Sequence, residues 1–158
     1  MRPKTGLAGL CGAIVLSTCC AACASPADQL RPRVAEAARE HATSALHQLQ
    51  TVTPLTQETL TRAITEIPRN ENRVGGTVLI RKDVPAGGKY TAQYAFVALI
   101  GDGFTGGAYE QLALRLCVTY TGDLSRPGAV EMADLTCPPG LPGPDNGVPV
   151  EQEIKLAG

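Results

Sequence analysis

The sequence predicts an α+β domain, with one or two N-terminal helices packed on an antiparallel meander sheet of four to five strands. Two observations lead to this prediction. Between residues 27 and 67, apolar residues recur at steps of three and four, which is the period of one helix face. From residue 74 onwards the period changes to two, and segments rich in Gly and Pro separate the alternating stretches. Helical segments followed by a run of strands are typical of α+β domains.

The first 24 residues have the parts of an export signal. Arg2 and Lys4 give a positive start, residues 7–16 are apolar, and residues 22–24 match an A-x-A cleavage pattern before Ser25. The apolar run is shorter than the ~20 residues that a membrane-spanning helix needs. We therefore expect an exported protein in which residues 1–24 are a signal peptide and residues 25–137 form one domain.

The same segment also allows a lipid anchor. Residues 21–23 resemble the end of a bacterial lipobox, in which the cysteine is lipidated, although Cys20 stands where Leu is usual. Lipidation of Cys23 would hold the protein at the outer face of the cytoplasmic membrane, whereas cleavage before Ser25 would release it. The sequence leaves both alternatives open.

Composition narrows the classes of partner. Without Arg2 and Lys4, 12 basic residues stand against 15 acidic ones, and the chain has no Trp, four Tyr and two Phe. Nucleic-acid binding needs a basic surface with aromatic residues for stacking, so no nucleic-acid partner is expected. Outside the signal region the chain has two cysteines, Cys117 and Cys137. Such a pair in an exported domain predicts a structural disulfide.

The first helix is predicted from about Leu30 to Gln50. Its residues are mostly Ala, Glu, Arg and Leu, which favour helices. Pro32 sets the predicted start, because proline is tolerated best in the first turn of a helix.

The second helix is predicted over residues 57–67. Thr56 fits the N-cap, and Leu55 with Leu60 fits the hydrophobic-staple arrangement around it. Pro68 is expected to end this helix.

Strands are predicted at 77–84, 89–100, 109–120 and 128–137. Residues 101–106 spell G-x-G-x-x-G, the string of a dinucleotide-binding loop. That loop requires a following helix, whose N-terminus receives the pyrophosphate. Here the next segment alternates from Leu112 to Tyr120 and so predicts a strand. Residues 101–107 are therefore expected to be a hairpin loop, and no cofactor is expected.

Strand register assigns side chains to the two faces of the sheet. A three-residue first loop, 86–88, places Val78 opposite Phe96 and Ile80 opposite Tyr94. A seven-residue second loop, 101–107, places Phe96 opposite Leu112. One continuous apolar face results, and we expect the helices to cover it.

The other face of the predicted sheet carries both polar and apolar side chains. It carries the candidate binding residues Arg81, Gln93, Gln111 and Arg115, of which the arginines are suited to hold an anionic group bidentately. The ordinary alternative is that the arginines solvate a sheet that is packed on one face only. An apolar end of this face (Leu79, Val97, Leu99) would rest on the C-terminal segment or receive a partner.

Residues 138–158 begin as a Pro/Gly-rich tether. From Val148 to Leu156 the chain alternates again. This part is predicted as an edge strand or a loose tail, and both alternatives stay open.

No catalytic or metal site is predicted. His41 and His47 are six residues apart, about 120° out of phase on a helix, so they do not face one metal ion together. No serine lies in a G-x-S-x-G elbow. Asp102 and Asp123 are expected in loops at opposite ends of the third strand, which argues against a cooperating pair.

The order of helices and meander resembles the cystatin-like arrangement in outline, which implies a fold and no particular function. The export signal, the Ala/Arg-rich helix and the lone disulfide resemble the small exported proteins and lipoproteins of high-GC Gram-positive bacteria. This resemblance is one of general character and rests on no diagnostic motif. From the predicted export and the mixed sheet face, we expect a non-catalytic binding or interaction module outside the cytoplasmic membrane, with an envelope protein or a small ligand as partner. The alternatives are a small secreted hydrolase-like enzyme using Asp102 or Asp123, and a secreted inhibitor using loop 101–107.

Overall fold

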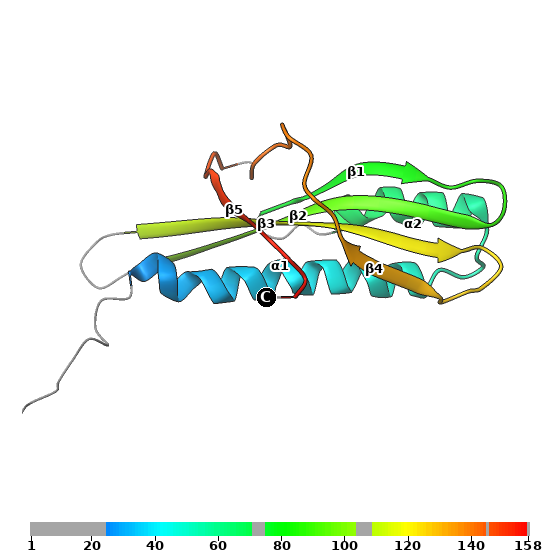
Figure 1. Cartoon of the computed structure of the whole chain (residues 1–158), viewed down its shortest axis with the longest axis horizontal. Helices are drawn as coiled ribbons and strands as arrows, with labels where there is room; N and C mark the ends of the chain where they lie inside the picture. The colour runs from blue at the N-terminus through cyan, green and yellow to red at the C-terminus, as the bar shows by residue number, and fades with distance from the viewer. Residues whose placement is uncertain (1–24, 71–74, 104–108, 145, 158) are drawn as a thin grey trace, which may run out of the picture.

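A computed structural model of the chain describes residues 25–70, 75–103, 109–144 and 146–157. It has two layers, a pair of helices and a five-stranded sheet, which is the α+β arrangement that the sequence predicts (Figure 1). The predicted export signal, including Cys23, lies outside the described residues, as do residues 104–108 of the predicted second loop.

Helix α1 spans Pro26–Gln50 and begins before the predicted start at Leu30. Ser25 is its N-cap. The Ser25 hydroxyl accepts a hydrogen bond from the backbone N–H of Asp28 at 3.2 Å, and the Asp28 carboxylate accepts one from the backbone N–H of Ser25 at 3.2 Å. This capping box satisfies donors that a helix end leaves without partners. The helix therefore starts at the cap, and Pro32 lies inside it.

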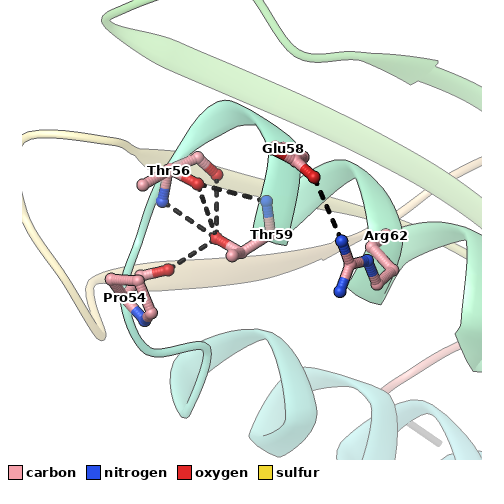
Figure 2. Close-up of polar contacts among 5 residues, drawn as sticks. All are labelled: Pro54, Thr56, Glu58, Thr59 and Arg62. Carbon is pink, nitrogen blue, oxygen red and sulfur yellow. Dashed lines mark hydrogen bonds and ion pairs between the residues drawn. The ribbon is translucent and has the colours of Figure 1, made fainter.

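Helix α2 spans Gln57–Asn70, and Thr56 caps it as predicted. Figure 2 shows the reciprocal contacts: the Thr56 hydroxyl accepts from the Thr59 N–H at 3.2 Å, and the Thr59 hydroxyl accepts from the Thr56 N–H at 3.0 Å. The predicted end at Pro68 is wrong, because the helix continues past it. Proline cannot donate to the carbonyl four residues back, and the hydroxyl of Tyr94 supplies that bond to Ile64 at 2.7 Å.

The sheet contains β1 (Thr77–Asp83), β2 (Lys89–Gly103), β3 (Tyr109–Asp123), β4 (Val130–Asp134) and β5 (Val150–Ile154). Strands β1 to β4 form an antiparallel meander in chain order. Strand β5 pairs with β3 in parallel, so the prediction of a wholly antiparallel sheet is wrong for this strand. Strand β4 pairs with residues 118–122 and β5 with residues 113–116, so both lie along one edge of β3.

The β2–β3 hairpin is longer than predicted. Phe96 lies opposite Leu116, whereas the predicted register placed it opposite Leu112. The prediction ended the second strand at its glycines, but Gly101 to Gly103 continue the ladder. The difference is an even number of residues, and therefore each side chain keeps its predicted face.

Strand β1 contains a bulge at Ile80 that the sequence did not predict. Beyond the bulge Arg81 lies opposite Gln93, but before it Leu79 lies opposite Tyr94. The one extra residue turns the first half of the strand over. Leu79, which was expected on the mixed face, therefore packs against the main core.

The main core lies between the sheet and both helices, so the prediction that the helices cover the apolar face is confirmed. The strands β2 and β3 contribute alternate buried residues to it: Tyr90, Ala92, Tyr94, Phe96, Ala98, Leu112, Leu114, Leu116, Val118 and Tyr120. The rings of Tyr94 and Tyr120 meet edge to face with centroids 5.7 Å apart. The Tyr120 hydroxyl also donates to the carbonyl of Ala42 in α1 at 2.7 Å.

Candidate functional site

The face of the sheet that points away from the helices has two halves. The covered half consists of buried residues from β2 and β3: Ala95, Val97, Leu99, Ala113, Arg115 and Cys117. The open half lies nearer the β1–β2 turn and consists of exposed or half-buried residues from four strands: Arg81, Asp83, Thr91, Gln93, Thr119, Thr121, Glu131 and Ala133.

The C-terminal segment (residues 138–144 and 146–156) packs on the covered half. Val97, Leu99 and Ala113 form a second small core with Val148 and Val150. For Val97 and Leu99 of the predicted apolar end, the structure has the first of the two alternatives: they rest on the C-terminal segment, whereas Leu79 packs on the other face.

Arg115 belongs to this covered half and is only 9% exposed. Its Nη2 donates hydrogen bonds to the carbonyl of Leu141 at 3.2 Å and to that of Pro142 at 2.7 Å. Its Nε is buried and has no hydrogen-bond partner among the residues that the structure describes. Arg115 therefore contacts the chain's own C-terminal segment and is not available at the open surface.

The C-terminal segment is attached at both of its ends. At its start, the Cys117–Cys137 disulfide is formed as predicted and joins it to β3. At its end, the Leu156 N–H donates to the Asp134 carboxylate at 2.8 Å, and Arg39 of α1 donates through Nε to the Lys155 carbonyl at 3.0 Å. Figure 1 shows the end of the chain beside α1.

The open half presents two rows of side chains across four strands. In the register of the sheet, the first row is Arg81–Gln93–Thr119–Ala133 and the second is Asp83–Thr91–Thr121–Glu131. The rows combine basic, acidic and neutral polar groups. Such a surface is suited to a partner with polar groups of both charges.

The structure does not bring the four predicted binding residues together. Arg81 and Gln93 are direct neighbours across β1 and β2. Arg115 lies four residues along β3 from Thr119, the neighbour of Gln93, which is roughly 13 Å of strand. Gln111 lies another four residues beyond, opposite Gly101. The predicted set therefore divides into one adjacent pair and two separate residues.

Thr119 is a member of the open half that the sequence did not single out as a binding residue. Its Oγ1 is buried and finds no hydrogen-bond partner within the described part of the chain, although Thr119 lies between Gln93 and Ala133 on a polar surface. Buried hydroxyls normally have a partner. The alternating pattern of the sequence predicted that Thr119 lies on this face. Its position beside Gln93 follows only from the observed pairing of the strands.

The two aspartates of the enzyme alternative have different positions. The carboxylate of Asp123 accepts hydrogen bonds from the Ser125 N–H at 2.8 Å and the Ser125 hydroxyl at 2.6 Å, and these bonds lower the pKa of Asp123. Asp123 thus shapes the turn after β3. Asp102 belongs to β2, opposite Glu110, and not to a loop as predicted. The two aspartates lie at opposite ends of β3, as expected.

A shallow polar concavity runs along the exposed side of α2, on the other layer of the molecule. It is lined by Gln57, Glu58, Thr61, Arg62, Thr65 and Glu66. Glu58 and Arg62 form an exposed pair at 3.1 Å, which Figure 2 shows beside the helix cap. An exposed pair one turn apart contributes little to stability. None of the predicted binding residues lines this concavity, so it serves as a reference surface for experiments.

The described residues contain no cluster of three or more His, Cys, Asp or Glu side chains placed to hold a metal ion. Within the same residues, no helix is long and apolar enough to cross a membrane. Of the histidines, His47 is exposed, whereas His41 is buried in α1.

The chain matches no family model, no curated protein and no solved structure.

Proposed function

We propose that this chain is an exported, non-catalytic module that binds an envelope protein or a small polar ligand through the open half of its sheet. The observation that carries the proposal is the adjacency of Arg81 and Gln93 on the part of the outer face that the C-terminal segment leaves uncovered. Around them lie groups of both charges, Asp83 and Glu131 among them.

Export is supported by the disulfide between Cys117 and Cys137, which is compatible with an oxidising compartment. We propose that the chain is released from Ser25 or anchored through a lipid on Cys23 to the outer face of the cytoplasmic membrane. Either form leaves the domain outside the cytoplasm, where an envelope protein or a diffusible ligand meets it.

The division of the outer face gives a reason for a binding role. Once the C-terminal segment has covered the apolar residues, the remaining half is polar and four strands wide. A polar sheet face is soluble without a partner, so the module would exist free and bind reversibly. An arginine next to an amide side chain offers several donors at fixed spacing, which favours a partner that presents carboxylate or carbonyl oxygens.

The test compares matched alanine variants for capture of partners from the medium and the envelope of the producing cells. The double variant Arg81→Ala, Gln93→Ala is expected to retain at most about a tenth of the partner, since hydrogen bonds to a charged group contribute roughly 1.5–3 kcal/mol. The control, Arg62→Ala on α2, removes an exposed arginine from the other layer and is expected to change nothing. Equal capture by both variants would reject the open half as the binding surface.

A further inference from the structure

The positively charged guanidinium of Arg115 is enclosed between the sheet and the C-terminal segment. Arg115 is nine-tenths buried, and its hydrogen-bond partners are two carbonyls held by a single nitrogen, Nη2. Among the described residues, no carboxylate forms an ion pair with it. A buried charge is costly unless an opposite charge and hydrogen bonds compensate it.

The shape of the guanidinium indicates how an anion would bind. A planar oxyanion accepts two parallel hydrogen bonds, from either Nε with Nη2 or Nη1 with Nη2. Nη2 belongs to both donor pairs, and it holds the carbonyls of Leu141 and Pro142. An oxyanion that binds with two hydrogen bonds must therefore replace at least one of these carbonyls.

The surroundings of Arg115 indicate the rest of the ligand. Val97 lies directly opposite Arg115, and Leu99 lies opposite Ala113 on the same face. These apolar residues are covered by Val148 and Val150, which belong to the same C-terminal segment as Leu141 and Pro142. A ligand that displaces this segment from Arg115 reaches an apolar surface next to the charge.

From these contacts we infer that Arg115, Val97 and Leu99 form a site for an aliphatic carboxylate. Its carboxylate replaces the Leu141 and Pro142 carbonyls on the guanidinium, and its chain replaces Val148 and Val150 on the sheet. The bond to a carboxylate is charge-assisted and stronger than the bond to a carbonyl, which favours the exchange at the guanidinium. Binding at this site loosens residues 138–144 and 146–150 while β3 and the disulfide keep their places.

This site is distinct from the open half of the proposed function. Arg115 lies roughly 13 Å along β3 from Thr119, and the disulfide at Cys117 lies between them. Variants at Arg115 and variants on the open half therefore test different surfaces. A negative result for one proposal does not contradict the other.

The test titrates octanoate, with octanol as a neutral ligand of the same chain length, into the purified disulfide-bonded protein and measures binding calorimetrically. Octanoate is expected to bind about tenfold or more tightly than octanol, and Arg115→Gln is expected to remove that difference. Arg62→Gln, on the exposed side of α2 and outside both proposed binding surfaces, is the matched control and should bind octanoate like the wild type. Arg115→Lys keeps the charge but not the paired donors, and should lose part of the difference.

A second measurement needs only the wild-type protein. Octanoate is expected to speed amide hydrogen exchange at Gly147 and Val148, whose N–H groups donate to the Pro144 carbonyl and the Asn146 side chain, because the segment that contains these bonds is released. Equal binding of octanoate and octanol, or unchanged exchange at these amides, would overturn the inference. Binding of inorganic phosphate as tight as that of octanoate would overturn the assignment of an aliphatic ligand.

Discussion

The hydroxyl of Tyr94 on β2 donates a 2.7 Å hydrogen bond to the carbonyl of Ile64 in α2, four residues before Pro68. In a regular helix this carbonyl accepts from the backbone N–H of residue 68, and proline has none. A side chain of the sheet thus completes the helix that lies on it. This one bond explains why α2 continues past Pro68, and it fixes the helix layer to the sheet layer.

Replacing Tyr94 and Tyr120 separately tests this arrangement. Tyr94→Phe leaves the buried Ile64 carbonyl without a donor and is expected to lower the free energy of unfolding by about 1–3 kcal/mol. Tyr120→Phe removes a bond of equal length to Ala42, whose carbonyl lies in a part of α1 without proline, and should cost less, about 1 kcal/mol. Urea denaturation of both variants measures the difference. A smaller loss for Tyr94→Phe than for Tyr120→Phe would contradict the assignment.

Stability should fall in alkaline solution because Tyr94 is buried. Burial raises the pKa of Tyr94 above its ordinary value of 10.0, since the charged phenolate is poorly solvated there. The folded state then holds its proton more firmly than the unfolded state, so the contribution is complete below pH 10 and is lost as the pH rises above it. The urea midpoint is expected to decrease above pH 10, and less steeply in Tyr94→Phe. If the urea midpoint fell equally steeply with pH in the wild type and in Tyr94→Phe, the burial of Tyr94 would not be the cause.

The disulfide should stabilise the domain by restricting its unfolded chain. Cys117 and Cys137 are separated by 20 residues, and closing a loop of this length contributes roughly 3 kcal/mol on the chain-entropy model. The double variant Cys117→Ala, Cys137→Ala is expected to lose about that amount in urea denaturation. Addition of reductant should destabilise the wild type similarly and leave the double variant unchanged. An effect of reductant on the double variant would point to some other target.

The turn after β3 should respond to Ser125. Two hydrogen bonds from Ser125, more than the charge of Arg126, hold the pKa of Asp123 below its ordinary value of 3.8. Its stabilising contribution is therefore present above pH 3.8 and is lost on acidification through the lowered pKa. Ser125→Ala removes one of the two bonds and is expected to raise the pKa of Asp123 in an NMR titration. An unchanged pKa in that variant would show that the hydroxyl is not the cause.

Periodicity was sufficient to predict the faces of β2 and β3 and the layer that covers them. Phe96 and Leu116 reached the core face although their register was predicted four residues away, because an even shift preserves the face. Leu79 did not follow its prediction, since the bulge at Ile80 adds one residue to β1. Nothing local in an alternating stretch marks where a bulge lies, and therefore the first half of β1 was assigned to the wrong face.

The binding residues were harder to predict than the fold. Arg81 on β1 and Arg115 on β3 lie on strands separated by β2, and the predicted register placed both side chains on one face of the sheet. Two features separate them. The strands β2 and β3 pair four residues away from the predicted register, so Thr119 and not Arg115 lies opposite Gln93, and the path of the C-terminal segment covers Arg115 with the Leu141 and Pro142 carbonyls. That path depends on the parallel pairing of β5 with β3, a contact between distant residues that follows a Pro/Gly-rich tether without a pattern of its own.

The central claim is that the open half of the sheet binds the partner, and site-specific photo-cross-linking tests it most directly. A cross-linking side chain is placed at Gln93 on the open half or at Glu66 on the exposed side of α2, and the protein is irradiated in the envelope of the producing cells. If the open half binds the partner, we expect a discrete adduct from position 93 that Arg81→Ala diminishes, and no adduct from position 66. The same adduct from position 66, or none from position 93, would contradict it.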